Sequence, residues 1–116
     1  MIAGVGTDIV EVNRIAKAIE HWGNHFLEHV FSEEEIAYCL RYKSPAEHFA
    51  GRFAAKEAVI KALPDIKNLK WTDIKIVNDK SGKPHCSVSH KDLKQTIHIS
   101  ISHTHAHAIA FAVIAA

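Results

Sequence analysis

The sequence predicts an α+β fold in which a mainly antiparallel sheet packs against about three main helices. The chain opens with an alternating segment rich in Val and Ile, which indicates a strand. Helix-start signals follow in the first half, and short strand-like segments separated by turns fill the second half. The regular strand–helix alternation of a parallel sheet does not occur. With 116 residues in the chain, we expect 1–116 to form a single domain.

The first strand is expected at residues 2–12, where Val and Ile alternate with smaller residues. Gly4, Gly6 and Asp8 share one face of this strand, because side chains alternate across a strand. Asp8 is the only charged residue on that face.

A first helix should follow directly. Asn13 is a favourable N-cap for a helix that begins at Arg14, and the Gly23-Asn24 pair should break it. Apolar residues at i, i+4 and i+7 predict a buried stripe that consists of Ile15, Ile19 and Trp22.

Two further helices have their own start signals. Ser32-Glu-Glu-Glu35 has the capping-box pattern. Ser44 followed by Pro45 starts another helix, because proline is favoured at the first helical position, and Pro64 should end it. This last helix contains Arg-Phe-Ala-Ala-Lys-Glu-Ala at 52–58, which places charged residues in an otherwise apolar helix.

The remaining segments are typical of strands and are expected at residues 74–77, 84–88, 96–102 and 108–114. A turn at 79–82 separates the first two. The last two should form a hairpin, which fits the antiparallel sheet.

Composition limits the possible functions. Apolar residues make up 47% of the chain and charged residues 23%, as in ordinary globular proteins. No apolar run reaches the roughly 18 residues of a membrane span, and a net charge of +1 gives no general attraction to nucleic acid. The N-terminus lacks a signal-peptide pattern and only two cysteines are present. We therefore expect a cytoplasmic protein with neither a membrane nor a nucleic-acid partner.

Lys56 lies in the middle of the apolar face of the helix that follows Ser44, with Glu57 at the edge of that face. The apolar side chains of this face are Phe49, Phe53, Ile60 and Leu63. Burying an unpaired ammonium is unfavourable. Lys56 should therefore either pair with a carboxylate as a structural ion pair or reach an anion at an opening in the core.

Arg52 and Lys61 favour the second possibility for this helix. With Lys56 they bring three cations within about three helical turns, beside the carboxylate of Glu57. Such a set suits a phosphorylated ligand and a divalent metal. Asp8 could supply a second carboxylate, since Mg²⁺ prefers oxygen ligands and retains several waters. The alternative for Asp8 is a hydrogen-bonded turn or helix-entry residue.

Ten histidines offer a competing metal site. His103, His105 and His107 alternate, so they would share one face of an extended segment, as zinc ligands require. We do not favour this site, because the expected hairpin turn falls within these residues. A second set, spaced by four residues but interrupted by the Gly-Asn pair, consists of His21, His25 and His29.

Several segments occur in an order that is informative as a whole. They are Gly-Val-Gly-Thr-Asp-Ile-Val-Glu-Val-Asn-Arg-Ile at 4–15, Phe-Ser-Glu-Glu-Glu at 31–35, Arg-Phe-Ala-Ala-Lys-Glu-Ala at 52–58, Gly-Lys-Pro at 82–84 and Ile-Ser-Ile-Ser-His at 99–103. This order resembles the holo-[acyl-carrier-protein] synthases, a family of 4′-phosphopantetheinyl transferases. The resemblance runs essentially from end to end, and its Gly-Thr-Asp-Ile and Lys-Glu-Ala motifs are specific as a pair.

The resemblance implies a Mg²⁺-dependent enzyme that transfers 4′-phosphopantetheine from coenzyme A to a serine of apo acyl carrier protein and releases adenosine 3′,5′-bisphosphate. It also implies the α+β fold of that family, a homotrimer with active sites between subunits, and a role in fatty acid biosynthesis. The alternative is a non-catalytic oligomeric module that binds coenzyme A or a nucleotide. The presence of both carboxylates argues against that alternative.

Carried over by position, the resemblance implies that Asp8 and Glu57 are Mg²⁺ ligands. Arg52, Lys56 and Lys61 would hold the pyrophosphate, and either lysine could assist the departing phosphate. The serine proton would pass to Glu57, to a metal-bound water or to a water held by Asp8. The segments expected to contact the nucleotide, partly from a neighbouring subunit, are Gly82-Lys83-Pro84 and Ser102-His103-Thr104.

Arg14, Lys17 and His21 form a cationic face on the first helix, because their spacing is i, i+3 and i+7. Acyl carrier proteins are acidic, so this face suits carrier docking, although a simply solvated face is the alternative. Two segments depart from the family pattern. Residues 64–66 replace a glycine-containing turn, and residues 24–25 stand where the family often has another basic residue.

Overall fold

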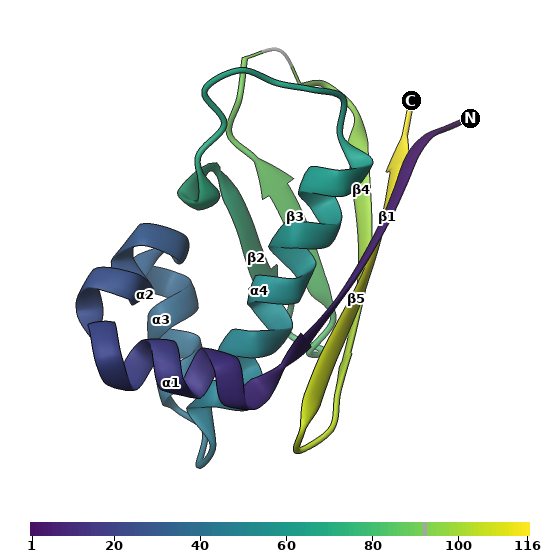
Figure 1. The fold of residues 1–116 in the computed structure, drawn as a ribbon. Helices are drawn as coiled ribbons and strands as arrows, with labels where there is room; N and C mark the ends of the chain where they lie inside the picture. The colour runs from purple at the N-terminus through teal and green to yellow at the C-terminus, as the bar shows by residue number, and fades with distance from the viewer. Residues whose placement is uncertain (92) are drawn as a thin grey trace.

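A computed structural model describes residues 1–91 and 93–116 and has the α+β architecture expected from the sequence (Figure 1). The helices are α1 (Val12–Trp22), α2 (Asn24–Val30), α3 (Glu33–Leu40) and α4 (Pro45–Ala62). The strands are β1 (Ile2–Glu11), β2 (Ile74–Asn78), β3 (Pro84–Val88), β4 (Thr96–His103) and β5 (His107–Ala115), and a 3₁₀ turn, Trp71–Asp73, precedes β2. Within these described residues, no helix is both long and apolar enough to cross a membrane.

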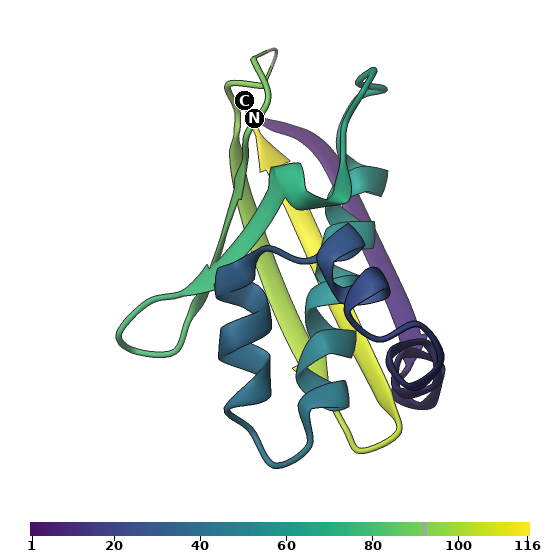
Figure 2. The same cartoon turned by 90° about the vertical axis from the view of Figure 1, so that its left-hand side faces the viewer.

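Two antiparallel sheets form the β part of the molecule. The larger has the strand order β1-β5-β4, and the smaller is the β2–β3 hairpin. Asp8 pairs with Ala110 of β5, and Ala110 pairs on its other side with Ile101 of β4. The helix α4 lies along one face of the larger sheet, with α2 and α3 on the other side of α4 (Figures 1 and 2).

Small residues allow α4 to approach β1 closely. A Cβ placed on Gly6 would overlap the carbonyl oxygen of Ala58. A Cβ on Gly4 would overlap the carbonyl oxygen of Ala62, one turn further along α4. Glycine is therefore required where this strand meets the helix backbone. Asp8 is the next residue on the same face of β1, so the close packing brings its side chain against α4.

A buried ion pair joins α3 to α4. Lys56 is fully buried, and its Nζ donates to Oε1 of Glu35 at 2.8 Å. The same ammonium donates to the backbone oxygens of Val30 at 2.7 Å and Trp71 at 3.2 Å, which uses all three of its donors. The second carboxylate oxygen of Glu35 accepts from the backbone N–H of Ile76 at 2.8 Å. Burial lowers the pKa of the Lys56 ammonium, and the Glu35 carboxylate opposes this shift.

Most of the expected elements are confirmed. Ser32 and Glu35 form the reciprocal capping box at the start of α3. The helix α4 ends before Pro64, and β4 and β5 form the expected hairpin. Ile60 was expected on the buried face of α4 but is 39% exposed.

The expectation for the first helix is wrong in two respects. The helix begins at Val12, so Asn13 lies inside it, and the N-cap residue Glu11 makes no side-chain capping bond. Trp22 is 59% exposed and does not belong to a buried stripe. The helix ends at Trp22, as expected from the Gly23-Asn24 pair, and after Gly23, whose φ of 56° suits glycine, the chain enters α2. The sequence gives little sign of α2, because this short helix has no side-chain cap.

Candidate functional site

Two carboxylates and a lysine meet where β1 packs against α4. The side chain of Asp8 is 17% exposed, and Lys61 Nζ donates to its Oδ1 at 3.2 Å. The same ammonium donates to the backbone oxygen of Thr7 at 3.0 Å. Burial raises the pKa of Glu57, one turn before Lys61, and the charge of Asp8 raises it further, while Lys61 opposes both effects. We refer to Asp8 and Glu57 as the carboxylate pair.

The carboxylate pair fits a hard divalent cation. Two like charges in a partly buried position are unfavourable, and Lys61, with a side chain 53% exposed, compensates them only weakly. Mg²⁺ is usually held by one or two carboxylates together with water and substrate phosphates. Over residues 1–91 and 93–116, no group of three or more His, Cys, Asp or Glu side chains is arranged to hold a metal. A cation at the carboxylate pair would therefore take its other ligands from water or substrate.

Arg52, a second cation on α4, is buried and has no counter-ion within residues 1–91 and 93–116. The residue is 5% exposed, and its guanidinium carbon lies 4.0 Å from the centroid of the Tyr38 ring. Its Nη2 donates to Oδ1 of Asn78 at 2.7 Å, whereas its buried Nε has no hydrogen-bond partner. Among the described residues, no carboxylate forms an ion pair with Arg52. Because buried guanidinium groups are normally paired, this one is suited to an anionic ligand.

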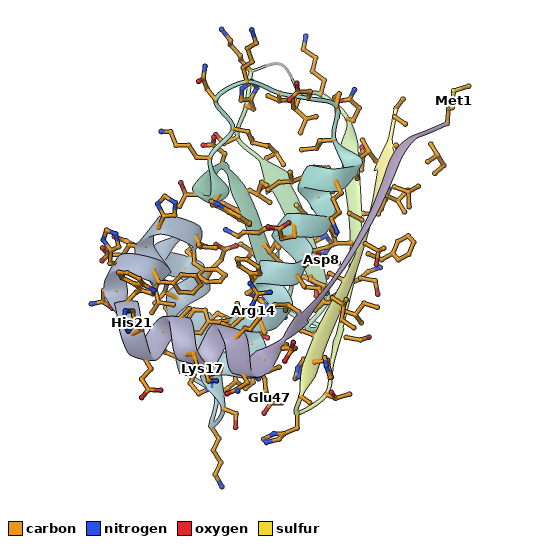
Figure 3. The ribbon with its side chains drawn as sticks, in the orientation of Figure 1. Met1, Asp8, Arg14, Lys17, His21 and Glu47 are labelled. Atoms are coloured by element: carbon orange, nitrogen blue, oxygen red, sulfur yellow. The ribbon has the colours of Figure 1, made fainter. Side chains whose placement is uncertain are left out.

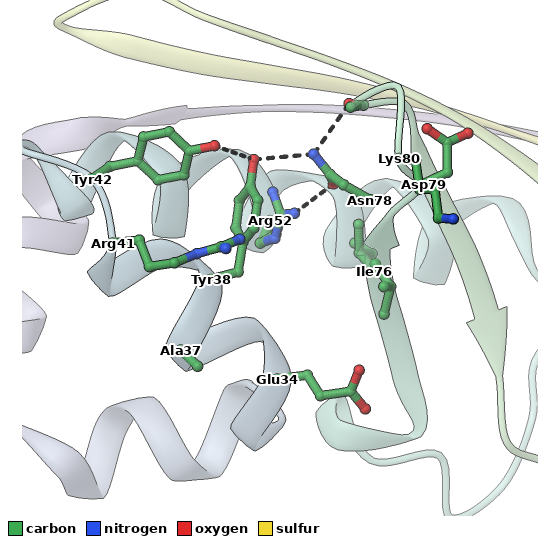
Figure 4. A pocket seen from close by; sticks show the side chains of 12 residues that line it. Glu34, Ala37, Tyr38, Arg41, Tyr42, Arg52, Ile76, Asn78, Asp79 and Lys80 are labelled. Atoms are coloured by element: carbon green, nitrogen blue, oxygen red, sulfur yellow. Dashed lines mark hydrogen bonds between the residues drawn. The ribbon is translucent and has the colours of Figure 1, made fainter.

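Arg52 lies between two cavities that are built by segments far apart in the sequence. The smaller cavity has a volume of about 200 Å³ and is lined by α3, α4, the turn after β2 and β4. Its lining includes Arg52, Gly82, Pro84 and His103. The larger cavity, about 630 Å³, extends from Arg52 along α3 and the end of β2 (Figure 4). We call the smaller one the Arg52 cavity.

His103, at the end of β4, lines the Arg52 cavity and is supported by the start of α4. Its Nδ1 lies 3.4 Å from Oε1 of Glu47, and Oε2 of Glu47 lies 3.3 Å from Nδ1 of His105. The rings of His103 and His48 meet edge to face, with centroids 5.1 Å apart. Burial lowers the pKa of His48, and the charges of His103 and Arg52 lower it further, whereas Glu47 opposes them. Among the described residues that line the Arg52 cavity, Arg52 carries a positive charge and none is acidic.

The turn after β2 is fixed by its own hydrogen bonds. Oδ1 of Asp79 accepts from the backbone N–H groups of Ser81 at 2.9 Å and Lys83 at 3.0 Å. Gly82 has a φ of 89°, a conformation that favours glycine. The turn therefore presents Gly82 and Pro84 to the Arg52 cavity in a defined conformation, while Lys83 remains exposed.

Ser102 and Thr104 flank His103, and both are exposed. The backbone N–H of Thr104 donates to the carbonyl oxygen of His107 at 2.8 Å. Its Oγ1 accepts from the backbone N–H of His107 at 3.1 Å. Thr104 therefore closes the β4–β5 turn that positions His103.

The carboxylate pair and the Arg52 cavity face different sides of α4. His48 and Glu57 are nine positions apart in α4, which at about 100° per residue leaves them half a turn apart around the helix. Asp8 belongs to β1 and His103 to β4, which are the two edge strands of the larger sheet. The structure thus brings Asp8, Glu57 and Lys61 together, and separately Arg52, His103 and the turn at Gly82.

Lys56 belongs to neither group, and this contradicts its expected contact with coenzyme A and its expected catalytic role. The residue is fully buried, and its ammonium donates to three protein acceptors, Glu35, Val30 and Trp71. No donor is left for a ligand. The alternative drawn from the sequence, a structural ion pair, describes Lys56 correctly.

The expected cationic face of α1 is present as an exposed surface. Arg14, Lys17 and His21 are all exposed on this helix (Figure 3). The ring of His21 meets that of Trp22 edge to face, with centroids 4.5 Å apart. Neither set of regularly spaced histidines forms a metal-binding group in the described part of the chain.

Sequence reasoning missed Asn78 and Tyr38, which hold Arg52. Asn78 lies 26 positions beyond Arg52 and Tyr38 lies 14 positions before it. No local pattern connects residues at such separations. The only sequence signal was the turn composition directly after Asn78, which located the turn but not the partner of the amide.

Comparison with known proteins places this geometry in a family. The model of the 4′-phosphopantetheinyl transferase superfamily matches residues 4–112. A holo-[acyl-carrier-protein] synthase of Protochlamydia amoebophila is 47% identical over 119 residues, which cover 97% of this chain and 98% of that protein. One from Clostridium tetani is 45% identical and covers 98% of this chain and 96% of that protein. The chain belongs to the 4′-phosphopantetheinyl transferase superfamily.

Solved structures of similar proteins agree with this assignment. The holo-(acyl-carrier-protein) synthase of Bacillus anthracis, in complex with coenzyme A (3′,5′-ADP), has a TM-score of 0.84 at 37% identity and covers 98% of this chain and 96% of that chain. The synthase of Helicobacter pylori in complex with coenzyme A has a TM-score of 0.83 at 34% identity, with coverages of 96% and 99%. The expected fold type is therefore confirmed.

We predict that Glu57→Gln removes cation binding without weakening the fold. The raised pKa means that folded Glu57 holds its proton more tightly than the unfolded chain does, so its ionisation costs stability as the pH rises through that pKa. Glutamine does not ionise. With a chelator present, the variant should match the unmodified protein at about pH 4 and be at least as stable at about pH 8.

Thermal unfolding with and without Mg²⁺ tests this prediction. Mg²⁺ at ten times its Kd should stabilise the unmodified protein by about 1.4 kcal/mol and the Glu57→Gln variant by much less. Glu34→Gln, an exposed change on α3, is the matched control and should respond to Mg²⁺ like the unmodified protein. Equal stabilisation of all three proteins would contradict the assignment of the cation to the carboxylate pair.

Proposed function

We propose that this chain transfers the 4′-phosphopantetheine group of coenzyme A to a serine of apo acyl carrier protein and releases adenosine 3′,5′-bisphosphate. The observation that carries the proposal is the buried, unpaired guanidinium of Arg52 beside a cavity lined by Gly82 and His103. Such a cation suits a phosphate group, which guanidinium binds in a well-defined geometry. The names of the relatives, and the coenzyme A complexes of two similar structures, support the same activity.

The Arg52 cavity is the proposed nucleotide site. Arg52 and His103 would contact a phosphate of the nucleotide, and the Gly82-Lys83-Pro84 turn would lie against its adenosine. Ser102 and Thr104 flank His103 and complete the same edge of the site. This assignment replaces the expected contact of Arg52 with the pyrophosphate, because Arg52 lies with the nucleotide turn and not with the carboxylate pair.

The carboxylate pair is the proposed Mg²⁺ site. The bound ion would neutralise negative charge on the pyrophosphate of coenzyme A. Lys61 is exposed beside Asp8 and can donate to the departing phosphate as its negative charge develops. The serine oxygen attacks the phosphorus that carries pantetheine, and the bond from that phosphorus to the bridging oxygen breaks. Glu57 or a water held by Asp8 accepts the serine proton.

An oligomer would bring the two groups on α4 together, and we propose a homotrimer in which the carboxylate pair of one subunit faces the Arg52 cavity of the next. The outer face of the larger sheet supports this assembly. It exposes Val5, Ile9, Ile109 and Phe111, whose exposed fractions are between 45% and 65%. Neighbouring apolar side chains on a sheet are usually buried against another molecule.

Arg14, Lys17 and His21 form the proposed docking surface for the acidic carrier protein. The charges of Arg14 and Lys17 are exposed on α1, so they can steer association even though the whole chain carries a net charge of only +1. Cys39 and Cys86 are free thiols, which suits the cytoplasm. We place the enzyme there, in fatty acid biosynthesis.

A transfer assay tests the proposed function. The protein is incubated with coenzyme A, Mg²⁺ and apo acyl carrier protein, and the carrier is weighed by mass spectrometry. We expect one phosphopantetheine to be added to each carrier, with none added when Mg²⁺ is chelated. A carrier of unchanged mass, with coenzyme A still bound by the protein, would instead support the non-catalytic binding module.

Mixing two inactive variants should restore activity if the site is shared between subunits. Glu57→Ala lacks one half of the site and His103→Ala lacks part of the other. Each mixed trimer has one intact site in three, so an equal and fully exchanged mixture should recover about a quarter of the activity. Activity no greater than that of the separate variants, in a mixture shown to exchange subunits, would contradict the shared site.

Charge reversal on α1 should affect the carrier and leave coenzyme A unaffected. We predict that Arg14→Glu/Lys17→Glu raises the KM for the carrier about tenfold or more and makes it less sensitive to salt, because an attractive contact becomes repulsive. The KM for coenzyme A should not change. Lys67→Glu/Lys70→Glu carries the same change of charge on another exposed segment and serves as the control. If both double variants raise the carrier KM equally, docking is not localised on α1.

A further inference from the structure

Among the residues that the structure describes, only neutral groups hold Arg52 in place. The Tyr38 ring lies 4.0 Å from the guanidinium carbon, and Oδ1 of Asn78 accepts from Nη2 at 2.7 Å. Lys56, one turn further along α4, is instead neutralised by Glu35 at 2.8 Å. The helix thus buries two cations in consecutive turns, and in the described part of the chain a carboxylate compensates only Lys56.

The amide of Asn78 joins Arg52 to the turn after β2, as Figure 4 shows. Its Nδ2 donates to the backbone oxygen of Gly82 at 3.1 Å and to the hydroxyl of Tyr38 at 3.0 Å. The Tyr38 hydroxyl also accepts from the hydroxyl of Tyr42 at 2.9 Å. Exchanging Oδ1 and Nδ2 would set a donor against Arg52 and an acceptor against the Gly82 oxygen. The network therefore fixes the orientation of the amide.

We propose that Asn78 is a positioning residue that fixes the Arg52 guanidinium and the Gly82 turn around one phosphate of the nucleotide and leaves the charge of Arg52 uncompensated. The inference rests on the proposed function, because coenzyme A supplies that phosphate. A fixed guanidinium loses less conformational entropy when the phosphate binds. A neutral acceptor keeps its positive charge available for that phosphate.

The substitution Asn78→Asp tests whether the neutral charge of Asn78 matters, because aspartate has nearly the shape of asparagine but carries a negative charge. It would still accept from Arg52, yet the resulting ion pair would compete with the phosphate for the guanidinium. It would also set a carboxylate oxygen against the backbone oxygen of Gly82. Alanine, by contrast, leaves Arg52 charged but removes its acceptor and the bond to the turn.

Isothermal titration calorimetry with coenzyme A tests the proposal on the unmodified protein, Asn78→Asp and Asn78→Ala. We expect the Kd to be at least about tenfold weaker for Asn78→Asp, and weaker than in the unmodified protein for Asn78→Ala as well. Asn68→Asp is the matched control, because Asn68 is exposed and its positive φ of 64° is tolerated by aspartate. That control should bind coenzyme A within about twofold of the unmodified protein.

The same substitutions in an Arg52→Ala background show whether Asn78 acts through Arg52. If it does, Asn78→Asp should weaken binding by a clearly smaller factor in that background, because only its effect on the Gly82 turn remains. A residue that only stabilised the fold would weaken binding by the same factor in both backgrounds. Circular dichroism confirms that each variant is folded before it is titrated.

Each outcome decides one question. Normal coenzyme A binding by Asn78→Asp, or an equal loss with and without Arg52, would overturn the positioning role. If Asn78→Asp does not fold, the loss of coenzyme A affinity caused by Asn78→Ala is compared with and without Arg52 instead, and an equal loss would again overturn the positioning role. Failure of the unmodified protein to bind coenzyme A would refute the proposed function instead, so the two failures are distinguishable.

Discussion

The buried ion pair between Lys56 and Glu35 is the interaction on which the rest of the structure depends. Glu35 closes the capping box of α3, pairs with α4 and accepts from the backbone of β2 at Ile76. Loss of either partner would leave a buried charge, which typically costs about 3–5 kcal/mol. Because β2 ends at Asn78, directly before the turn at Gly82, the pair also sets where that turn lies relative to α4.

Arg52 and Lys56 are two buried cations of the same helix with different roles. Lys56 has three protein acceptors and belongs to the core. Arg52 is almost as deeply buried but has a neutral amide, an aromatic ring and an unsatisfied Nε. A buried cation that the protein leaves uncompensated is unfavourable unless a ligand supplies the anion. Glu57 is the opposite case, because the nearby charge of Asp8 raises its pKa. Two carboxylates held together in this way are suited to binding a cation.

The fold was largely predictable because its signals are local. The capping box at Ser32, the Pro45 start of α4 and the alternation of the strands each depend on a few adjacent residues. The carboxylate pair could be named but not brought together, since Asp8 and Glu57 meet only through the packing of β1 on α4. Lys56 had two open interpretations for the same reason: its partner lies 21 positions away. The resemblance to a known family indicated the reaction, but it could not show that Lys56 lies outside the proposed site.

The most direct test of this account is side-chain ¹⁵N NMR during titration with coenzyme A. Both cations are buried, so the Nε–H of Arg52 and the ammonium of Lys56 should exchange slowly enough to be observed, and Arg52→Lys and Lys56→Met assign their signals. We expect coenzyme A to shift the Arg52 Nε–H signal strongly and to leave the Lys56 signal almost unchanged. A strong shift at Lys56 with none at Arg52 would contradict the division between a structural and a ligand-binding cation.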